Sequence, residues 1–304
     1  MMNNKTPKRL EVCKVNLGPL GLGTEHFARG VRNFKNLTRE ENSKLILEES
    51  YKLGIRHYDL VYGLPYFFNI FRDFIKNRRE KITFTSHISN VYNEQTGKSG
   101  KTRSLKKIKE AFDDMLERLN TDYVDIALIQ FITTLKDYAG VIKNRNLEFV
   151  KQLKEEGRSK AIGISAHNPD LLMKIIEKDD YDLIMYPLNF ATGYLKSTKN
   201  LIEICKNKGI AIIAIKNLLK GKVLNRKTNH YSAYFCGGNK FKMKLNIPAT
   251  AAQCLNYAFD LGADSVVFGV KTVEELRINL QSYESEKATK NYWEIAKKVK
   301  DAFL

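Results

Sequence analysis

Short apolar runs alternate along the whole chain with amphipathic segments of helical period. Several runs are apolar almost throughout, which is typical of strands covered on both faces. This alternation predicts a parallel sheet whose strands are joined by crossover helices. The predicted strands are 15–23, 55–60, 81–88, 123–131, 159–165, 181–188, 209–215 and 264–270.

The segments between these runs predict helices. The first opens at Thr38, where Glu41 follows at capping-box spacing, and Gly54 ends it. A one-sided apolar stripe marks another helix over 105–119. The remaining predicted helices are 66–77, 146–156, 169–178, 197–208, 248–260, 273–282 and 289–302.

Eight strand–helix units predict a single (β/α)8 TIM barrel over residues 1–304, with a C-terminal extra helix. The alternative is a doubly wound sheet, but no GxGxxG motif follows the first strand. In a barrel, the functional site lies at the rim where the strands end.

Three long stretches, 89–103, 131–145 and 221–247, follow strands and therefore belong to this rim. Long loops in a compact domain are usually functional or disordered. The third is interpreted either as a lid or as a disordered surface excursion. Its notable residues are Tyr231, Tyr234, Phe235, Gly237 and Gly238.

The net charge of +17 raises the question of nucleic-acid binding. We do not expect it, because the cations are spread along the polar faces of helices instead of forming one patch. A positive field favours an anionic small-molecule substrate or cofactor. No apolar run approaches a membrane helix and no secretory signal is evident, so we expect a cytoplasmic protein without a membrane partner.

The cysteines are widely spaced and form no CxxC pair, so we expect reduced thiols and no metal site. They are Cys13, Cys205, Cys236 and Cys254.

Six segments near the strand ends occur in the order and spacing of a known family. They are GIRHYDLVYG, DYVDIALIQF, AIGISAHNP, MYPLNF, GIAIIAIKNLLKGK and VVFGVKTVEELRINL. Across nearly the whole chain they resemble the aldo-keto reductase superfamily. They are nearest to the bacterial branch that often carries a ferredoxin-like tail, although no cysteine cluster for that tail is present. The resemblance implies that a nicotinamide cofactor gives hydride to a carbonyl and that a tyrosine protonates the alkoxide. It also implies a lysine–aspartate pair that lowers the tyrosine pKa and a histidine that orients the carbonyl.

The catalytic positions match only in part. Asp59 corresponds to the family aspartate, whereas His87 stands where the lysine is expected and Gln130 where the histidine is expected. In one explanation, Asp59 and His87 form a carboxylate–imidazole pair that supplies a tunable proton donor, and Gln130 holds the carbonyl oxygen. In the other, the site no longer performs hydride chemistry.

The tyrosine position has two alignments. The family writes D-x-A-x-x-Y-G, so Tyr62 comes two residues early. Either the loop is shortened and Tyr62 occupies the catalytic position, or Leu64 occupies it with Tyr66 just beyond. His57 is interpreted as structural, because strand alternation places it one layer below Asp59 in the barrel interior.

The resemblance also implies a cofactor site. Candidate contacts at the strand ends and in the strand 7 loop are Gly23, Thr24, Ser165, Met185, Lys216 and Gly221. Met185 replaces an amide side chain of the family, so the nicotinamide end is altered.

The last barrel helix opens on Gly269, Lys271 and Thr272, followed by Glu275 and Asn279. A helix N-terminus with a lysine and a hydroxyl is a good phosphate site. Lys271 favours NADP(H) over NAD(H), and the charge of Glu275 weakens that preference.

The leading hypothesis is an NADP(H)-dependent oxidoreductase that reduces a carbonyl, on an anionic or sugar-type metabolite, with an altered proton-transfer set. One alternative is a non-redox barrel enzyme such as a lyase, isomerase or dehydratase. The other is a catalytically silent binding or scaffold member of the family.

Overall fold

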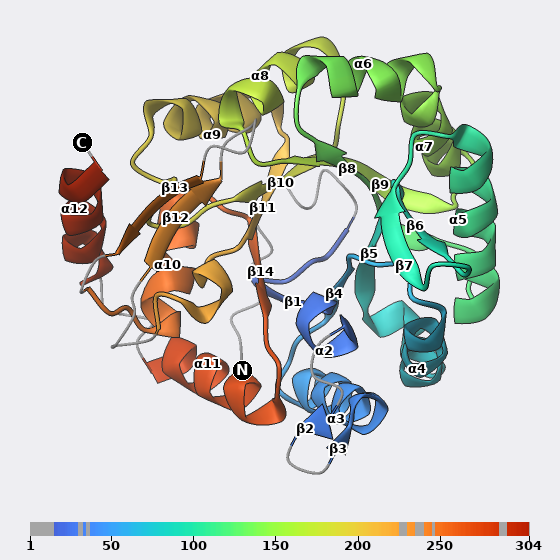
Figure 1. Cartoon of the computed structure of the whole chain (residues 1–304), viewed down its shortest axis with the longest axis horizontal. Helices are drawn as coiled ribbons and strands as arrows, with labels where there is room; N and C mark the ends of the chain where they lie inside the picture. Colours follow the sequence, from blue (N-terminus) through green and yellow to red (C-terminus); the bar gives the residue numbers. More distant parts are fainter. Residues whose placement is uncertain are drawn as a thin grey trace.

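The computed structural model describes residues 15–29, 33–34, 37–224, 230–234, 240–244, 247–285 and 291–303. Within them, eight parallel strands close into the predicted barrel, in the spatial order β1-β14-β11-β10-β9-β8-β5-β4 (Figure 1). The strands are β1 (Leu20–Gly23), β4 (His57–Leu60), β5 (Thr83–His87), β8 (Val124–Ile132), β9 (Ser159–Ala166), β10 (Leu183–Pro187), β11 (Ala211–Ile215) and β14 (Ser265–Gly269).

Helices surround the barrel as predicted (Figure 1). They are α3 (Arg39–Lys52), α4 (Pro65–Ile75), α5 (Leu105–Leu119), α7 (Asn146–Glu155), α8 (Pro169–Lys178), α9 (Lys196–Lys208), α10 (Ala251–Leu261) and α11 (Val273–Ser285). The capping box of α3 is confirmed, because Thr38 accepts from the Glu41 backbone and the Glu41 carboxylate accepts from Thr38 N. The predicted extra helix is α12 (Tyr292–Phe303), and Trp293 packs edge-on against Tyr257 of α10.

The barrel interior is filled with side chains from alternating strand positions. Gly163 leaves room for this packing, because a Cβ there would lie 2.5 Å from Leu183 Cδ1 and 2.7 Å from Leu128 Cδ1. His57 is fully buried below Asp59, as predicted, and its ring contacts the hydroxyls of Thr83 and Thr85. Burial lowers the pKa of His57 to about 4, so this ring is a neutral core residue.

The first strand is shorter than predicted, since β1 begins at Leu20 and not at residue 15. Gly18 has a φ of +66° and Pro19 has no N–H to donate, so regular strand pairing begins only at Leu20, although the Pro19 backbone oxygen accepts from the Val266 N–H at 2.9 Å. Val15 and Leu17 are nonetheless buried, because they pack against the residues that fill the barrel interior. Their apolar pattern therefore reflects burial without strand pairing.

The prediction of 131–145 as a long connection was wrong. β8 continues to Ile132, and helix α6 (Leu135–Lys143) occupies most of the rest. Thr134 caps this helix by accepting a hydrogen bond from the backbone N–H of Asp137. Tyr138 and Val141 form its buried face.

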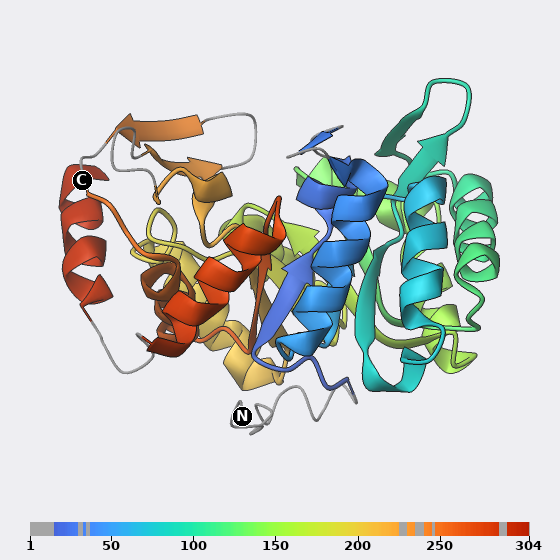
Figure 2. The same cartoon turned by 90° about the horizontal axis from the view of Figure 1, so that it is seen from below.

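The other two long stretches contain hairpins, β6 (Asn90–Asn93) with β7 (Lys98–Lys101) and β12 (His230–Tyr234) with β13 (Lys240–Lys244). Figure 2 shows both on the same side of the barrel. A third hairpin pairs β2 (Asn33–Phe34) with β3 (Leu37–Thr38), after the short helix α2 (Glu25–Arg29). Of the residues considered for a lid, Tyr231 and Tyr234 lie on β12, whereas Phe235, Gly237 and Gly238 lie outside the described residues.

None of the helices in the described ranges is long and apolar enough to cross a membrane.

Candidate active site

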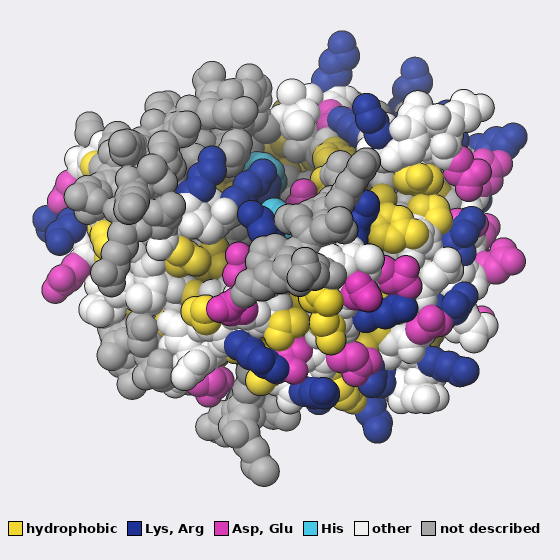
Figure 3. All heavy atoms as spheres, turned by 60° about the horizontal axis from the view of Figure 1, so that its bottom comes forward, with side chains coloured by type: hydrophobic (Ala, Val, Ile, Leu, Met, Phe, Trp, Pro, Cys, Tyr) yellow, Lys and Arg dark blue, Asp and Glu magenta, His cyan; other side chains and the backbone are white. Residues whose placement is uncertain are grey.

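A cavity of about 1230 Å³ lies at the carboxyl ends of the barrel strands. It exceeds the ~300–1,000 Å³ of typical ligand pockets. Figure 3 shows the hollow, with histidine side chains inside it and lysine or arginine side chains beside them. The predicted site residues that line it are Gly23, Asp59, Tyr62, His87, Gln130, Ser165, Met185, Lys216, Gly221, Gly269, Lys271, Glu275 and Asn279.

Two predicted cofactor contacts do not line this cavity. The Thr24 hydroxyl donates to the backbone oxygen of Asp59 at 2.9 Å, which joins the ends of β1 and β4. The Thr272 hydroxyl accepts from the backbone N–H of Glu275 at 3.1 Å and thereby caps α11. Both hydroxyls satisfy backbone groups instead of facing the cavity.

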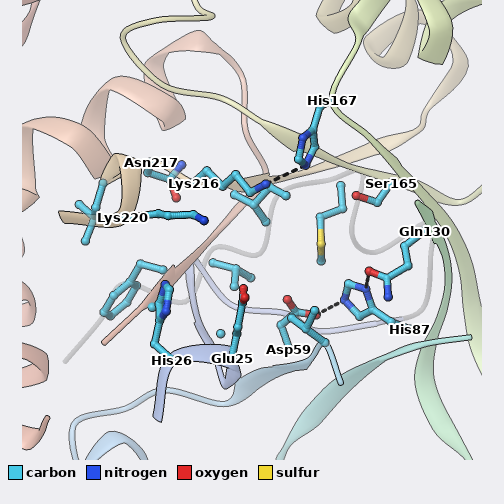
Figure 4. A pocket seen from close by; sticks show the side chains of 18 of the residues that line it. Glu25, His26, Asp59, His87, Gln130, Ser165, His167, Lys216, Asn217 and Lys220 are labelled. Carbon is cyan, nitrogen blue, oxygen red and sulfur yellow. Dashed lines mark hydrogen bonds and ion pairs between the residues drawn. The ribbon is translucent and has the colours of Figure 1, made fainter. Parts of the chain in front are cut away.

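Asp59, His87 and Gln130 form a buried hydrogen-bonded chain (Figure 4). His87 Nε2 lies 2.6 Å from Asp59 Oδ1, and His87 Nδ1 lies 2.5 Å from Gln130 Oε1. Both partner atoms are acceptors, so the ring must donate from both nitrogens, which requires the charged imidazolium. Burial alone would lower the pKa of His87, but the Asp59 carboxylate and the two hydrogen bonds offset it and hold this pKa above its usual value.

A bulge in β8 positions Gln130. The pairing of β8 with β9 shifts register between Ile129 and Ile132, and Phe131 adopts a φ of +61°. Bulges of this kind turn a side chain away from the regular strand direction. Gln130 Nε2 is buried and has no hydrogen-bond partner among the described residues. It is therefore a donor that a bound carbonyl oxygen could satisfy.

Tyr62, and neither Leu64 nor Tyr66, lines the cavity. The Tyr62 hydroxyl donates to Glu25 Oε1 at 3.2 Å. Leu64 is buried at the start of α4, whereas Tyr66 is exposed and accepts a hydrogen bond from Arg39 at 3.1 Å. Of the two alignments considered from the sequence, this geometry agrees with the shortened loop.

Lysines line the opposite wall of the cavity. Lys216 Nζ lies 2.9 Å from His167 Nε2 (Figure 4). Burial, followed by the charges of Lys216 and Lys220, lowers the pKa of His167 to about 3, so its neutral ring accepts this hydrogen bond. Burial and the neighbouring Lys220 lower the pKa of Lys216 to about 8. Lys216 therefore changes charge within the ordinary assay range.

The loop that carries these lysines has a strained backbone. Lys216, Leu219 and Lys220 all have left-handed φ values, of 57°, 46° and 60°, and Gly221 follows with 76°. Such conformations are unfavourable for residues with a Cβ and concentrate at functional sites. The Asn189 side chain holds the loop by donating to the backbone oxygen of Lys216 at 3.2 Å.

At the start of α11, the Glu275 carboxylate accepts from the backbone N–H of Lys271 at 2.7 Å. Lys271 lies two residues before α11 begins, so this bond takes up a backbone N–H on the approach to the helix N-terminus, where a phosphate would bind. The Lys271 backbone oxygen is held in turn by the Asn42 side chain at 2.8 Å. This end of the site therefore combines a lysine with an acid.

Four charged or titratable residues that sequence reasoning missed also line the cavity, namely Glu25, His26, His167 and Lys220. Each comes a few residues after a barrel strand, and that position was the available signal. They were missed because comparison with a family pattern considers only the positions that the pattern specifies.

The model of the aldo/keto reductase family matches residues 19–300. An uncharacterized oxidoreductase of Bacillus subtilis, YqkF, is 25% identical over 92% of this chain and 90% of its own length. The L-glyceraldehyde 3-phosphate reductase of Escherichia coli K12 is 25% identical over 69% of this chain and 62% of its own length.

Solved structures agree on the fold. The holo form of an aldo-keto reductase from Bacillus halodurans superimposes with a TM-score of 0.69 at 19% identity, covering 94% of this chain and 93% of that one. The glycerol dehydrogenase of Gluconobacter oxydans gives a TM-score of 0.68 at 16% identity, covering 94% and 92% of the two chains. At these identities the likeness shows the barrel fold alone.

Proposed function

The chain belongs to the aldo/keto reductase family and is an oxidoreductase, and on this premise we propose that it reduces a small-molecule carbonyl with NADP(H) through an altered proton-transfer set. His87 and Gln130 take the positions of the family lysine and histidine. The observation that carries the proposal is the buried Asp59–His87–Gln130 chain, which places a cation and an amide donor at the cavity wall.

The cavity residues fit a phosphate-bearing dinucleotide. Lys216, Lys220 and Lys271 line the cavity. Gly221 follows Lys220 directly, and the loop turns there. In this proposal Ser165 and Met185 lie at the nicotinamide end, with Gly23 nearby. Gly269, Glu275 and Asn279 lie at the adenosine end. When bound, the cofactor supplies the hydride for the carbonyl carbon.

The chain's own residues handle the substrate oxygen. The Gln130 amide donates to it and fixes its position. The Tyr62 hydroxyl gives it a proton, and the His87 imidazolium stabilises the negative charge that develops near it. An imidazolium held by Asp59 performs the electrostatic part of the role that the family gives to lysine.

Cofactor binding is the direct test. Titration with NADPH, followed through cofactor fluorescence, is expected to show saturable binding, and absence of binding at high micromolar cofactor would overturn the proposal. NADPH oxidation should then be measured with glyceraldehyde 3-phosphate and with unphosphorylated glyceraldehyde. We expect consumption stoichiometric with product and a preference for the anionic aldehyde; a product of unchanged oxidation state, formed without NADPH consumption, would contradict a reductase.

Glu275 should limit the preference for NADP(H). Replacing Glu275 by glutamine removes a negative charge beside Lys271, so we expect NADPH to bind about tenfold more tightly while NADH changes little. The Kd values of both cofactors, measured at one ionic strength, check this. Glu274→Gln, one residue away and outside the cavity lining, is the matched control. An equal change for both cofactors would mean that Glu275 does not face the 2′-phosphate.

Cofactor affinity should fall as pH rises through about 8. The pKa of Lys216 is lowered to about 8, so the lysine is charged below this pH and neutral above it. Loss of one cation near the pyrophosphate is expected to weaken NADPH binding about tenfold. Lys216→Arg stays charged across this range and should flatten the dependence. A dependence that persists unchanged in Lys216→Arg would assign it to another group.

A further inference from the structure

Glu25 places a carboxylate beside Tyr62. It is the second residue after β1 and the first of α2, and it is half-buried at the cavity wall. β1 pairs with β4 in register Gly23 to Asp59, so the segments that follow these two strands emerge side by side. The resulting contact is the hydrogen bond of 3.2 Å from the Tyr62 hydroxyl to Glu25 Oε1. Figure 4 shows the Glu25 side chain directed into the cavity, between His26 and Asp59.

His87 cannot exchange a proton directly with Tyr62 in this arrangement. An imidazolium has two N–H groups, and both are engaged, one with Asp59 and the other with Gln130. A lysine ammonium carries three, so one would remain for a tyrosine after the same two bonds. Any effect of His87 on Tyr62 is therefore exerted through its charge across the shared cavity, and the proton needs another acceptor.

We propose that Glu25 is the proton partner of Tyr62, so that the pair relays protons between the substrate oxygen and solvent. The inference rests on the proposed function. Glu25 acts through Tyr62 and is in that sense a positioning residue. Its half-buried position lets it exchange protons with water.

The relay is balanced in both directions. In alcohol oxidation, the hydroxyl proton of the substrate passes to the Tyr62 oxygen while the Tyr62 proton passes to Glu25 Oε1, and the hydride leaves the carbon for the oxidised nicotinamide. In carbonyl reduction, the Tyr62 proton passes to the substrate oxygen and protonated Glu25 restores it. Oxidation thus requires the Glu25 carboxylate and reduction requires the acid, so the two directions should depend on pH in opposite senses.

Charged groups from several elements face this pair across the cavity. The other titratable or charged residues that line it are His26, Asp59, His87, His167, Lys216, Lys220, Lys271 and Glu275. Among them, His87 and Lys216 interact electrostatically with Glu25. A pH effect is therefore assigned to Glu25 only when it disappears in a Glu25 variant.

A titration that needs neither cofactor nor substrate tests the contact. The tyrosinate absorbance difference between the wild type and Tyr62→Phe reports the ionisation of Tyr62 alone. In the Glu25→Gln background, the midpoint of the same absorbance difference should lie about one pH unit lower, because the phenolate no longer faces a carboxylate. An unchanged midpoint would overturn the proposal.

Kinetics test the relay itself. For alcohol oxidation, Glu25→Gln should lower kcat about 10²-fold and abolish the acid limb of the pH profile. The same substitution should add no further loss to Tyr62→Phe, because both act on one proton path. Glu155→Gln, an exposed change on α7, is the control. Additive losses, or an acid limb that survives in Glu25→Gln, would overturn the relay.

The two possible failures are distinguishable. If the wild type neither binds NADPH nor oxidises alcohols, the proposed function fails, while the Tyr62 titration still decides whether Glu25 and Tyr62 are coupled. If the wild type is active and the titration does not shift, the proposed function stands and the role of Glu25 falls.

Discussion

Replacing Tyr62 by phenylalanine is expected to lower kcat for carbonyl reduction by about 10²- to 10⁴-fold, the usual contribution of a general acid. The substitution removes one oxygen and keeps the ring at the cavity wall, so the Kd for NADPH should stay within about twofold. The reduced rate should no longer depend on Glu25, because the proton path between them is gone. Stopped-flow measurement of NADPH oxidation separates the chemical step from cofactor binding.

Tyr66→Phe is the matched control for this prediction. It makes the same chemical change four residues away, at an exposed ring that contacts Arg39 outside the cavity. We expect it to be active within about twofold of the wild type, as surface changes usually are. Full activity in Tyr62→Phe together with loss in Tyr66→Phe would mean that the ungapped alignment is correct and that α4 rearranges in the working enzyme.

Much of the fold could be predicted from the apolar runs in the sequence. Helices cover these strands on one side and the barrel interior covers them on the other, and such runs have few alternative structures. The start of β1 could not be predicted, because the apolar pattern of Val15 and Leu17 indicates burial and does not indicate whether the strand is paired. Helix α6 was missed for a related reason. Its buried face depends on Tyr138, whose hydroxyl donates to Asp179 and contacts Tyr181, long-range contacts that no local pattern contains.

The position of the cavity could also be predicted, because parallel strands bring their carboxyl ends to one rim. Asp59, His87 and Gln130 meet there for that reason. Which atoms bond to which could not be predicted. Two details depend on loop geometry that the sequence does not encode locally. One is the bulge that turns Gln130, and the other is the hydrogen bond from the Thr24 hydroxyl to the backbone, which takes it away from the cavity.

The charge of His87 should also make the free energy of unfolding depend on pH. Its pKa is raised above the ordinary histidine value, so the native state binds this proton more tightly than the unfolded chain does. The resulting stabilisation is fully present below ~6.5, the unfolded value, and is lost as pH rises through the folded pKa. The free energy of unfolding of the wild type, relative to His87→Gln, should therefore decrease over that rise.

The rate of carbonyl reduction should depend on the same proton of His87. His87→Gln keeps a hydrogen-bonding side chain but removes the cation from the cavity wall, and we expect kcat/KM for reduction to fall about 10²- to 10³-fold. In the wild type, kcat/KM should decline as pH rises through the raised pKa of His87, because the imidazolium is then lost. Profiles of kcat/KM against pH, with NADPH saturating, measure both effects.

His87→Lys separates charge from residue type. It introduces the lysine that the family resemblance leads us to expect at this position, and an ammonium has an unperturbed pKa near ~10.4. We therefore expect activity within about tenfold of the wild type and an alkaline decline displaced to higher pH. If His87→Lys is as inactive as His87→Gln while both bind NADPH normally, the positive charge is not what the site requires. The neutral imidazole would then be the working form, and the hydrogen bond between His87 and Gln130 would have to run from the amide to the ring.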